Sequence, residues 1–428
     1  MTLTQTLFQA FDRVPLIDPH SHINPRRPAS TNISDLLGYH YYTELAHSAG
    51  MPREWIEESG IAPEEKVARL FEYLHQINHT VQWSWFLELS KDLFGFEADG
   101  IDRGNWRDLY DLSLKKMSQK DWEEEVLRKS NVERIFLTND FDDPLDDFDT
   151  YRYVPCLRTD DLVFHLAQGT TRERVAKATG IEVGTLQDLQ KAIGALFTHF
   201  MRNQVRACAI SLPPWFAPRA VAIDDASARS AWERLVSNQE PSQADRETIA
   251  YWVFWRLAEF CEELKLPFDL MIGVNRKVYP EGVYQGQDLY DSRWSMIQYG
   301  GLFNAFPRVK FPISVLASVS NQELVDYAWI FPNVIANGHW WYSNTPTYIR
   351  HDLQARIDAI PRNKIIGYYS DAYKLEFILP KYRMFKRILA DILAESIVKQ
   401  RGLSESFAID LGTQILRGNV ESIFFEQE

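Results

Sequence analysis

The sequence predicts an α/β fold, a (β/α)8 barrel of the TIM type with an inserted helical lobe after its first strand. Eight short apolar runs alternate with stretches of helical periodicity, which is typical of a parallel sheet. Eight such units are the number that closes a barrel. The chain has 428 residues, of which 45% are hydrophobic and 13% aromatic, so it can bury a large core. We therefore expect a single barrel over residues 1–428, with residues 45–131 as the helical insertion.

The elements follow in order along the chain. The predicted strands cover residues 14–18, 132–138, 153–158, 206–211, 267–273, 309–315, 333–338 and 365–370. Between the first two strands, helical periodicity without a good strand covers residues 33–49, 55–58, 64–77, 83–94, 106–117 and 122–130. Later helices are expected at 186–202 and 246–264, and a helical tail over 381–400 and 405–425 is expected to close the outer ring.

The net charge of −13 and the pI near 5.3 argue against nucleic acid and membrane partners, because both require a basic surface. A small anionic substrate is compatible if local arginine or lysine binds it. The three cysteines form neither a disulfide framework nor a Cys-x-x-Cys metal motif, so a reducing cytoplasm is expected. No segment has the pattern of a signal peptide or a membrane-spanning helix. The sequence leaves open whether the chain forms a homo-oligomer.

Residues 17–24, with the sequence IDPHSHIN, predict a metal site. His20 and His22 are two apart where a buried strand ends, so both imidazoles are expected on one side, at the end of the barrel that carries active sites. Asp371, at the end of the eighth strand, is the expected third ligand. The alternatives left open are two ordinary strand-end histidines, and a helix N-cap role for Asp371.

Two imidazoles and one carboxylate leave a coordination position for water or substrate, as catalytic metal sites do. We expect one divalent metal, with zinc first and manganese or iron as alternatives. His339 is a further candidate ligand; the interpretation that the sequence favours is a histidine packed against indole rings or facing solvent.

Other strand ends carry candidate substrate ligands. Arg158 ends the third strand, and its planar guanidinium matches a carboxylate; a salt bridge to Asp160 or Asp161 is the alternative. Trp340 and Trp341 follow the seventh strand and could wall a sugar face or pack under loops.

The order of these motifs resembles the uronate (glucuronate) isomerase family of the amidohydrolase superfamily over nearly the whole chain. The segments that carry the resemblance are 18–22 (family Asp-Tyr-His-Cys-His), 38–41 (Gly-Asp-His-Tyr), 48–50 (Ser-Ala-Gly), 87–89 (Leu-Glu-Leu), 142–144 (Asp-Asp-Pro), 154–160 (Phe-Arg-Pro-Asp), 340–342 (Trp-Trp-Phe), 370–371 (Thr-Asp of Thr-Asp-Ser-Arg) and 382–389 (the helix Glu-Tyr-Phe-Arg-Arg-Ile-Leu).

The resemblance implies an aldose–ketose isomerase that converts D-glucuronate or D-galacturonate to the 2-keto sugar acid by proton transfer from C2 to C1. Asp371 would bind metal and abstract the proton, and His40 or Tyr41 would move the hydroxyl proton. The residues expected to bind the substrate are Arg158, Trp340, Trp341, Tyr373 and Lys374.

Two positions depart from the family pattern. Met271 stands where the family has a histidine on the fifth strand, and Tyr373 stands where it has an arginine, with Lys374 next to it as an imperfect substitute. These departures keep open a mononuclear metal-dependent hydrolase, an isomerase of another sugar acid, and a sugar-acid-binding protein that has lost catalysis.

Overall fold

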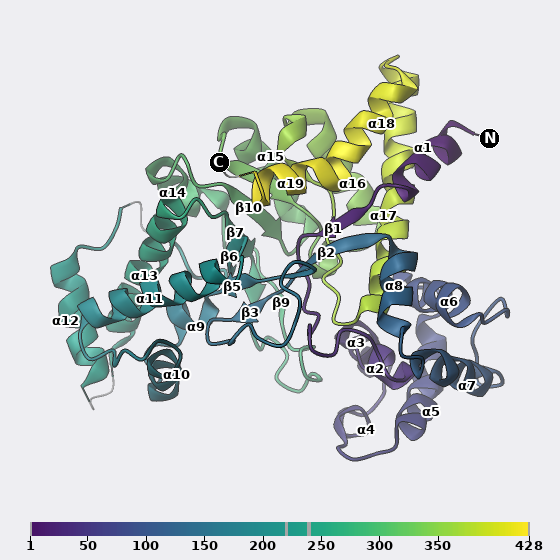
Figure 1. Ribbon diagram of the computed structural model, residues 1–428, viewed down its shortest axis with the longest axis horizontal. Helices are drawn as coiled ribbons and strands as arrows, with labels where there is room; N and C mark the ends of the chain where they lie inside the picture. The colour runs from purple at the N-terminus through teal and green to yellow at the C-terminus, as the bar shows by residue number, and fades with distance from the viewer. Residues whose placement is uncertain (1, 219–220, 238–240, 427–428) are drawn as a thin grey trace.

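The computed structural model describes residues 2–218, 221–237 and 241–426. Its eight main strand positions are the predicted ones, in the same order, with parallel pairing between neighbours (Figure 1). The predicted α/β class is confirmed. The strands are β1 (Leu16–Asp18), β2 (Val132–Phe136) continued by β3 (Asn139–Asp140), β4 (Tyr153–Val154) continued by β5 (Cys156–Arg158), β6 (Ala207–Leu212), β7 (Phe268–Ile272), β10 (Phe311–Val315), β11 (Val334–Asn337) and β12 (Ile365–Ile366).

The third predicted strand is interrupted and the eighth is shorter than expected. Pro155 separates β4 from β5, because proline has no N–H for a strand ladder. After β12, the Gly367 N–H donates to the Ile415 carbonyl (3.0 Å) instead of a neighbouring strand. The prediction of a strand through residue 370 was therefore wrong beyond Ile366.

Loop backbone closes the barrel between β12 and β1. We call residues 20–22 and 370–372 together the seam. The His22 N–H donates to the Ala372 carbonyl (2.8 Å), and the Asp371 N–H donates to the His20 carbonyl (3.1 Å). The series of strands thus returns to its first member, and the segments that follow the first and last strands lie side by side.

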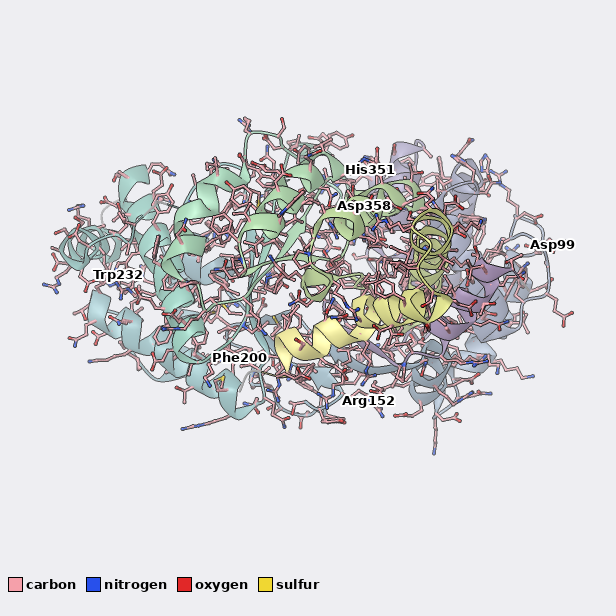
Figure 2. The ribbon with its side chains drawn as sticks, turned by 90° about the horizontal axis from the view of Figure 1, so that it is seen from above. Asp99, Arg152, Phe200, Trp232, His351 and Asp358 are labelled. Carbon is pink, nitrogen blue, oxygen red and sulfur yellow. The ribbon has the colours of Figure 1, made fainter. Side chains whose placement is uncertain are left out.

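Helices fill the chain between β1 and β2, as predicted. They are α2 (Ile33–Leu37), α3 (His40–Ser48), α4 (Arg53–Glu57), α5 (Pro63–Leu74), α6 (Val81–Phe94), α7 (Trp106–Met117) and α8 (Trp122–Ser130), with a 3-10 turn at His75–Ile77. Seen from above, Asp99 in this region and Trp232 lie toward opposite ends of an elongated molecule (Figure 2). The assignment of residues 45–131 as one insertion in a single barrel stays a prediction.

The remaining helices surround the strands. They are α1 (Leu3–Asp12), α9 (Asp160–Phe164), α10 (Gly169–Thr179), α11 (Leu186–Arg202), α12 (Asp225–Val236), α13 (Gln243–Glu263), α14 (Gly300–Ala305), α15 (Asn321–Ile330), α16 (Pro346–Ala359), α17 (Ile378–Ile392) continued by π-helical turns to Gln400, α18 (Glu405–Thr413) and α19 (Asn419–Phe424). None of the helices in the described ranges is long and apolar enough to cross a membrane.

The barrel strands share an apolar core of their own. Buried side chains from six of the eight barrel strands pack together with Val420, Ile423 and Phe424 of α19. The ring centroids of Phe136 and Phe424 are 4.9 Å apart. The C-terminal helix therefore covers part of the barrel core, whereas the sequence analysis expected the tail to close the outer ring of helices.

A short hairpin was not predicted. Its antiparallel strands are β8 (Val274–Asn275) and β9 (Leu289–Tyr290), and we call residues 276–288 between them the tip loop. Strands of two residues are too short to produce a detectable alternation of apolar and polar residues. The Tyr284 N–H donates to Glu57 (2.6 Å), so the tip loop is attached to the helical region.

Candidate metal centre and active-site cavity

A cavity of about 290 Å³ opens where the carboxyl ends of the strands meet. Eight of the ten predicted site residues line it: His20, His22, His40, Arg158, Trp340, Trp341, Asp371 and Tyr373. The lining omits the other two, Tyr41 and Lys374. Its volume is at the lower end of the range for small-molecule sites, which suits a compact ligand.

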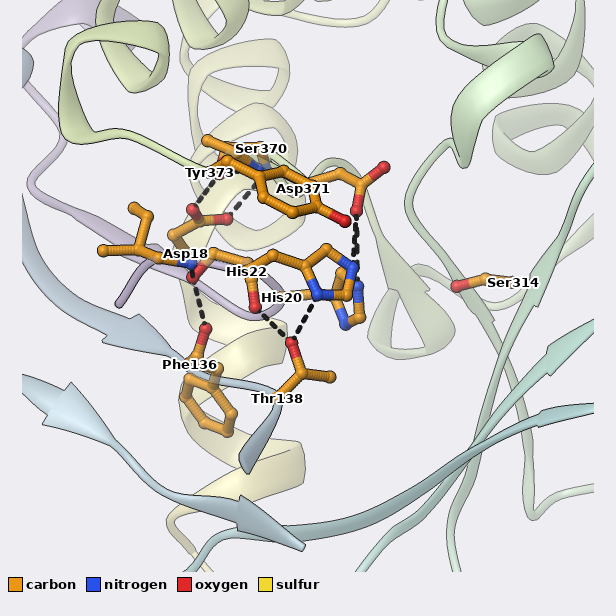
Figure 3. Close-up of polar contacts among 12 residues, drawn as sticks. Asp18, His20, His22, Phe136, Thr138, Ser314, Ser370, Asp371 and Tyr373 are labelled. Atoms are coloured by element: carbon orange, nitrogen blue, oxygen red, sulfur yellow. Dashed lines mark hydrogen bonds and ion pairs between the residues drawn. The ribbon is translucent and has the colours of Figure 1, made fainter. Parts of the chain in front are cut away.

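His20, His22 and Asp371 converge in this cavity (Figure 3). The Nε2 atoms of both histidines lie 3.4 Å from Asp371 Oδ1, and His20 and Asp371 are almost completely buried. Among the described residues, neither His20 Nε2 nor Asp371 Oδ1 has a hydrogen-bond partner. Buried polar atoms normally have partners. Three ligand atoms that face one another, two of them buried without a hydrogen-bond partner in the described chain, fit a divalent metal.

Thr138 fixes the orientation of His22. Its hydroxyl donates to the Ser21 carbonyl (2.5 Å) and lies 2.9 Å from His22 Nδ1. Because a carbonyl can only accept, the hydroxyl proton is used there, and Thr138 must accept from Nδ1–H. The Nε2 atom then carries the lone pair toward Asp371. Hydrogen bonding at the second nitrogen is the usual way in which a protein orients a metal-binding histidine.

Asp371 is held in an unusual backbone conformation. Its φ of 51° lies in the left-handed region, which costs a residue with a side chain about 1–2 kcal/mol. The preceding residue, Ser370, is fixed by Asp18, whose carboxylate accepts from the Ser370 N–H (2.8 Å) and hydroxyl (Figure 3). Tyr382 of α17 also donates to Asp18 (3.1 Å). Strain of this kind is typical of functional sites.

The charges of the cluster suit a cation. Burial raises the pKa of the Asp371 carboxyl, but the imidazoles of His20 and His22 close to it outweigh this effect and hold the pKa well below its usual value. Burial lowers the pKa of His22, and the neighbouring Asp371 only partly opposes it. The carboxylate is therefore ionised, and His22 retains a neutral imidazole as a potential ligand.

His40 and Tyr41 lie on the other side of Asp371. The Tyr41 hydroxyl donates to Asp371 Oδ2 (3.2 Å) from outside the cavity lining. Burial lowers the pKa of His40 to about 3, so its ring is neutral, and its Nδ1 has no partner within the described chain. Both residues begin α3, because the helix predicted over residues 33–49 is interrupted between α2 and α3.

The predicted substrate ligands are only partly brought together. Arg158 Nε lies 3.2 Å from Asp160 Oδ2, so the salt bridge considered as an alternative is present, while both side chains line the cavity. Tyr373 stacks on His22 with ring centroids 4.8 Å apart. Lys374 instead donates to the Arg27 carbonyl (3.2 Å). This placement gives no support to its predicted contact with a substrate.

Two further residues of interest have apolar surroundings. Met271 lines the cavity and packs with Trp340 and Tyr369. His339 is buried near Tyr368 and Phe385, and both its ring nitrogens lack a partner among the residues described. His339 does not belong to the candidate metal cluster, and its ring contacts among the described residues are with Tyr368 and Phe385 rather than with the indoles expected from the sequence.

Several lining residues were not singled out from the sequence. They are Thr138, Asp160, Ala209, Ile210, Ser211, Arg276, Tyr284, Gln285 and Asp288. Arg276 and Asp288 pair across the tip loop at 2.6 Å. The Gln285 amide donates to the Tyr373 hydroxyl (3.0 Å). Four of them had a signal in the sequence, because Thr138 and Ser211 end predicted strands, Arg276 follows the fifth strand, and Asp160 was considered as a partner of Arg158.

The fold and the site define a class of protein, an α/β barrel with a candidate mononuclear metal centre at the carboxyl ends of its strands. A family model described as glucuronate isomerase matches residues 2–412. The chain belongs to this family, as the sequence motifs predicted.

Individual relatives agree with this assignment. A uronate isomerase of Thermotoga sp. (strain RQ2) is 22% identical over 429 residues, which cover 92% of this chain and 91% of that protein. The crystal structure of uronate isomerase from Thermotoga maritima has a TM-score of 0.90 at 20% identity and covers 99% of this chain and 97% of that chain. The crystal structure of glucuronate isomerase from Caulobacter crescentus has a TM-score of 0.87 at 16% identity, covering 99% and 93%. At these identities the structural likeness establishes the fold.

Proposed function

We propose that this chain is a metal-dependent aldose–ketose isomerase that converts a hexuronate to the 2-keto sugar acid. The observation that carries the proposal is the arrangement around Asp371. One carboxylate oxygen faces the Nε2 atoms of His20 and His22, and the other accepts from the Tyr41 hydroxyl. One oxygen of the carboxylate can thus bind a metal while the other accepts a proton. Membership of the glucuronate isomerase family supports this choice of reaction.

The reaction moves protons without a change of overall oxidation state. A base removes the C2 proton of the aldose and returns it to C1, while the proton of the O2 hydroxyl passes to O1. We assign the transfer of the carbon-bound proton from C2 to C1 to Asp371, whose ionised carboxylate can accept it. His40, which is neutral and lines the cavity, and Tyr41 are assigned to the hydroxyl proton.

His20, His22 and Asp371 would hold the divalent metal. Such an ion polarises the sugar oxygens and favours loss of the neighbouring proton. We propose zinc first, because two imidazoles and a carboxylate with an open position are typical of catalytic zinc. Manganese and iron accept the same donors and remain the alternatives.

Arg158 would bind the substrate carboxylate. Asp160 orients its guanidinium, and a fork of N–H donors matches a carboxylate in a way that a lysine ammonium does not. Trp340, Trp341 and Tyr373 would form the walls around the sugar ring. Tyr373 takes the place of the family arginine, so its stacking on His22 is the contact by which it would act.

Isomerisation in D2O tests the proposal. The zinc- or manganese-loaded protein is incubated with D-glucuronate or D-galacturonate and followed by proton NMR. We expect ketose signals and loss of the C2 proton signal with at least one of the two substrates. His22→Ala should abolish both changes, whereas His79→Ala, the same change at an exposed histidine, should leave them intact. A metal-loaded protein that forms neither ketose nor exchanged substrate would contradict the proposal.

A further inference from the structure

Lys381 of α17 carries a fully buried ammonium group beside the metal cluster. It donates to the Ser370 carbonyl (2.7 Å) and to the Tyr39 hydroxyl (3.1 Å). It also lies 4.8–5.1 Å from the ring centroids of Tyr39, Tyr41 and Trp85, which is a cation–π arrangement. Within the described part of the chain, no carboxylate lies within ion-pair distance of it. Hydrogen bonds, aromatic faces and the more distant carboxylates of Asp371 and Asp18 therefore support the buried charge at this position.

The two hydrogen-bond partners of Lys381 lead to the backbone of Asp371 from both sides. The Ser370 carbonyl precedes the Asp371 peptide directly. The Tyr39 hydroxyl donates to the Asp371 carbonyl (2.6 Å), which follows it. One ammonium therefore fixes both carbonyl groups that flank the residue whose φ is 51°.

We propose that Lys381 is a positioning residue for Asp371. Together with Tyr39 it holds Asp371 in its left-handed conformation, so that the carboxylate stays between His20 and His22. The assignment of Asp371 as a metal ligand in this inference rests on the proposed function. The positioning itself concerns the backbone of the seam and is measurable in the metal-free protein.

A second buried lysine, Lys364, serves as a control, because it can stabilise the fold without contacting the seam. Lys364 donates to the Ala328 and Phe331 carbonyls, the latter at 2.6 Å, and is also buried. Neither of its partners adjoins a metal-ligand candidate. Lys364→Met and Lys381→Met thus make the same chemical change at two buried lysines that donate to backbone carbonyls, and only the second alters contacts to the seam.

Tyr39 has a matched control on α3. The Tyr42 hydroxyl also donates to a backbone carbonyl, that of Gln82 (2.7 Å), but it is remote from the seam. Tyr39→Phe and Tyr42→Phe each remove one buried hydroxyl and preserve the ring. These isosteric variants keep the test decisive if Lys381→Met fails to fold.

Two measurements on the full-length protein test the inference. Zinc affinity is measured by competition with a chromogenic chelator. Amide hydrogen exchange at Asp371 and His22, whose N–H groups close the seam, is measured on metal-free protein. We expect Tyr39→Phe and Lys381→Met to weaken zinc binding roughly 10- to 100-fold, as loss of outer-shell partners does, and to accelerate exchange at both amides. The zinc affinity of the double variant should be only slightly lower than that of the single variant that binds zinc less tightly, because both residues act through one chain of hydrogen bonds.

The controls decide between positioning and general destabilisation. Tyr42→Phe and Lys364→Met should lower the melting temperature without changing zinc affinity or exchange at the seam. Equal effects within each matched pair would overturn the inference. If the unmodified protein bound no zinc, the proposed function would fail, whereas the exchange comparison would still decide whether Lys381 positions Asp371.

Discussion

Thr138 determines which nitrogen of His22 faces Asp371, because its hydroxyl proton is already used by the Ser21 carbonyl. A metal ligand needs more than the correct residue type. It needs a fixed tautomer and ring orientation, and a neighbour in the segment between β2 and β3 supplies both.

Replacement of Thr138 by valine should therefore weaken metal binding. Thr138→Val preserves the shape of the side chain but removes the acceptor for His22 Nδ1–H. We expect a loss of roughly 10- to 100-fold in zinc affinity, measured by chelator competition. Thr198→Val, which removes a hydroxyl that bonds within α11, is the control and should change nothing. Unchanged affinity in Thr138→Val would contradict the assigned tautomer.

Glu44 gives the protein a pH-dependent stability. Burial raises the pKa of its carboxyl to about 8, although the nearby Trp341 indole opposes the shift. The folded protein therefore binds this proton more tightly than the unfolded chain does. The resulting stability is fully present below about pH 4.5 and is lost as the pH rises through about 8.

The variant Glu44→Gln should remove this pH dependence, because its amide stays neutral. Between pH 5 and 8.5 the unmodified protein should lose up to roughly 3–5 kcal/mol more stability than the variant. Melting temperatures across this range measure the difference. Glu97→Gln, at an exposed position, is the control. Parallel curves for the unmodified protein and Glu44→Gln would show that the carboxyl does not titrate in this way.

At the scale of elements, breaks in regular structure place the site. The helix expected over residues 33–49 stops at Leu37, and Tyr39, in an extended conformation, begins a second helix with His40 and Tyr41. The strands β1 and β12 end before the ligands, which lie in the segments that follow.

The tip loop is the element expected to control substrate binding. A Cβ at Gly282 would lie 2.2 Å from the Gly286 carbonyl oxygen, so Gly282→Ala must displace the loop that carries Tyr284 and Gln285. We expect kcat/KM to fall roughly 10- to 100-fold, chiefly through KM, because a displacement of about 1 Å has effects of this size.

Zinc affinity of Gly282→Ala should not change, since the tip loop provides no metal ligand. Gly300→Ala is the matched control, because a Cβ there meets no atom within 4 Å. If the kinetic constants of Gly282→Ala equalled those of Gly300→Ala, the tip loop would have no role in binding.

At the scale of the molecule, the candidate metal cluster lies where the first and the last strand of the barrel come together. Its candidate ligands follow the first and the last strand, and in the described structure two backbone hydrogen bonds join the two halves of the seam. A bound divalent ion would add a strong connection where the barrel closes.

Metal binding should therefore stabilise the whole fold. At a free zinc concentration 100 times Kd, linkage predicts about 2.7 kcal/mol, or a rise of about 3 °C in Tm for a chain of this size. Removal of metal with a chelator should reverse the rise. His22→Ala should show no response to zinc, whereas His79→Ala should respond fully. A response in His22→Ala equal to that of the unmodified protein would place the stabilising ion elsewhere.

The sequence by itself determined the eight strand positions, the helical region after the first strand and the convergence of the candidate ligands His20, His22 and Asp371. These features depend on local patterns, namely apolar periodicity, and on the rule that parallel strands bring their carboxyl ends together. The family motifs are local as well, so they too could be recognised without coordinates.

Only the tertiary structure decided the rest. The left-handed conformation of Asp371 depends on Asp18, Lys381 and Tyr39. Asp18 and Tyr39 are more than 300 positions away in the sequence, and Lys381 lies on α17. The turning of Lys374 toward backbone carbonyls and the entry of the tip loop into the cavity are likewise consequences of packing. Contacts between residues far apart in the chain leave no periodic signal in the sequence, and it is these contacts that orient the side chains of the site.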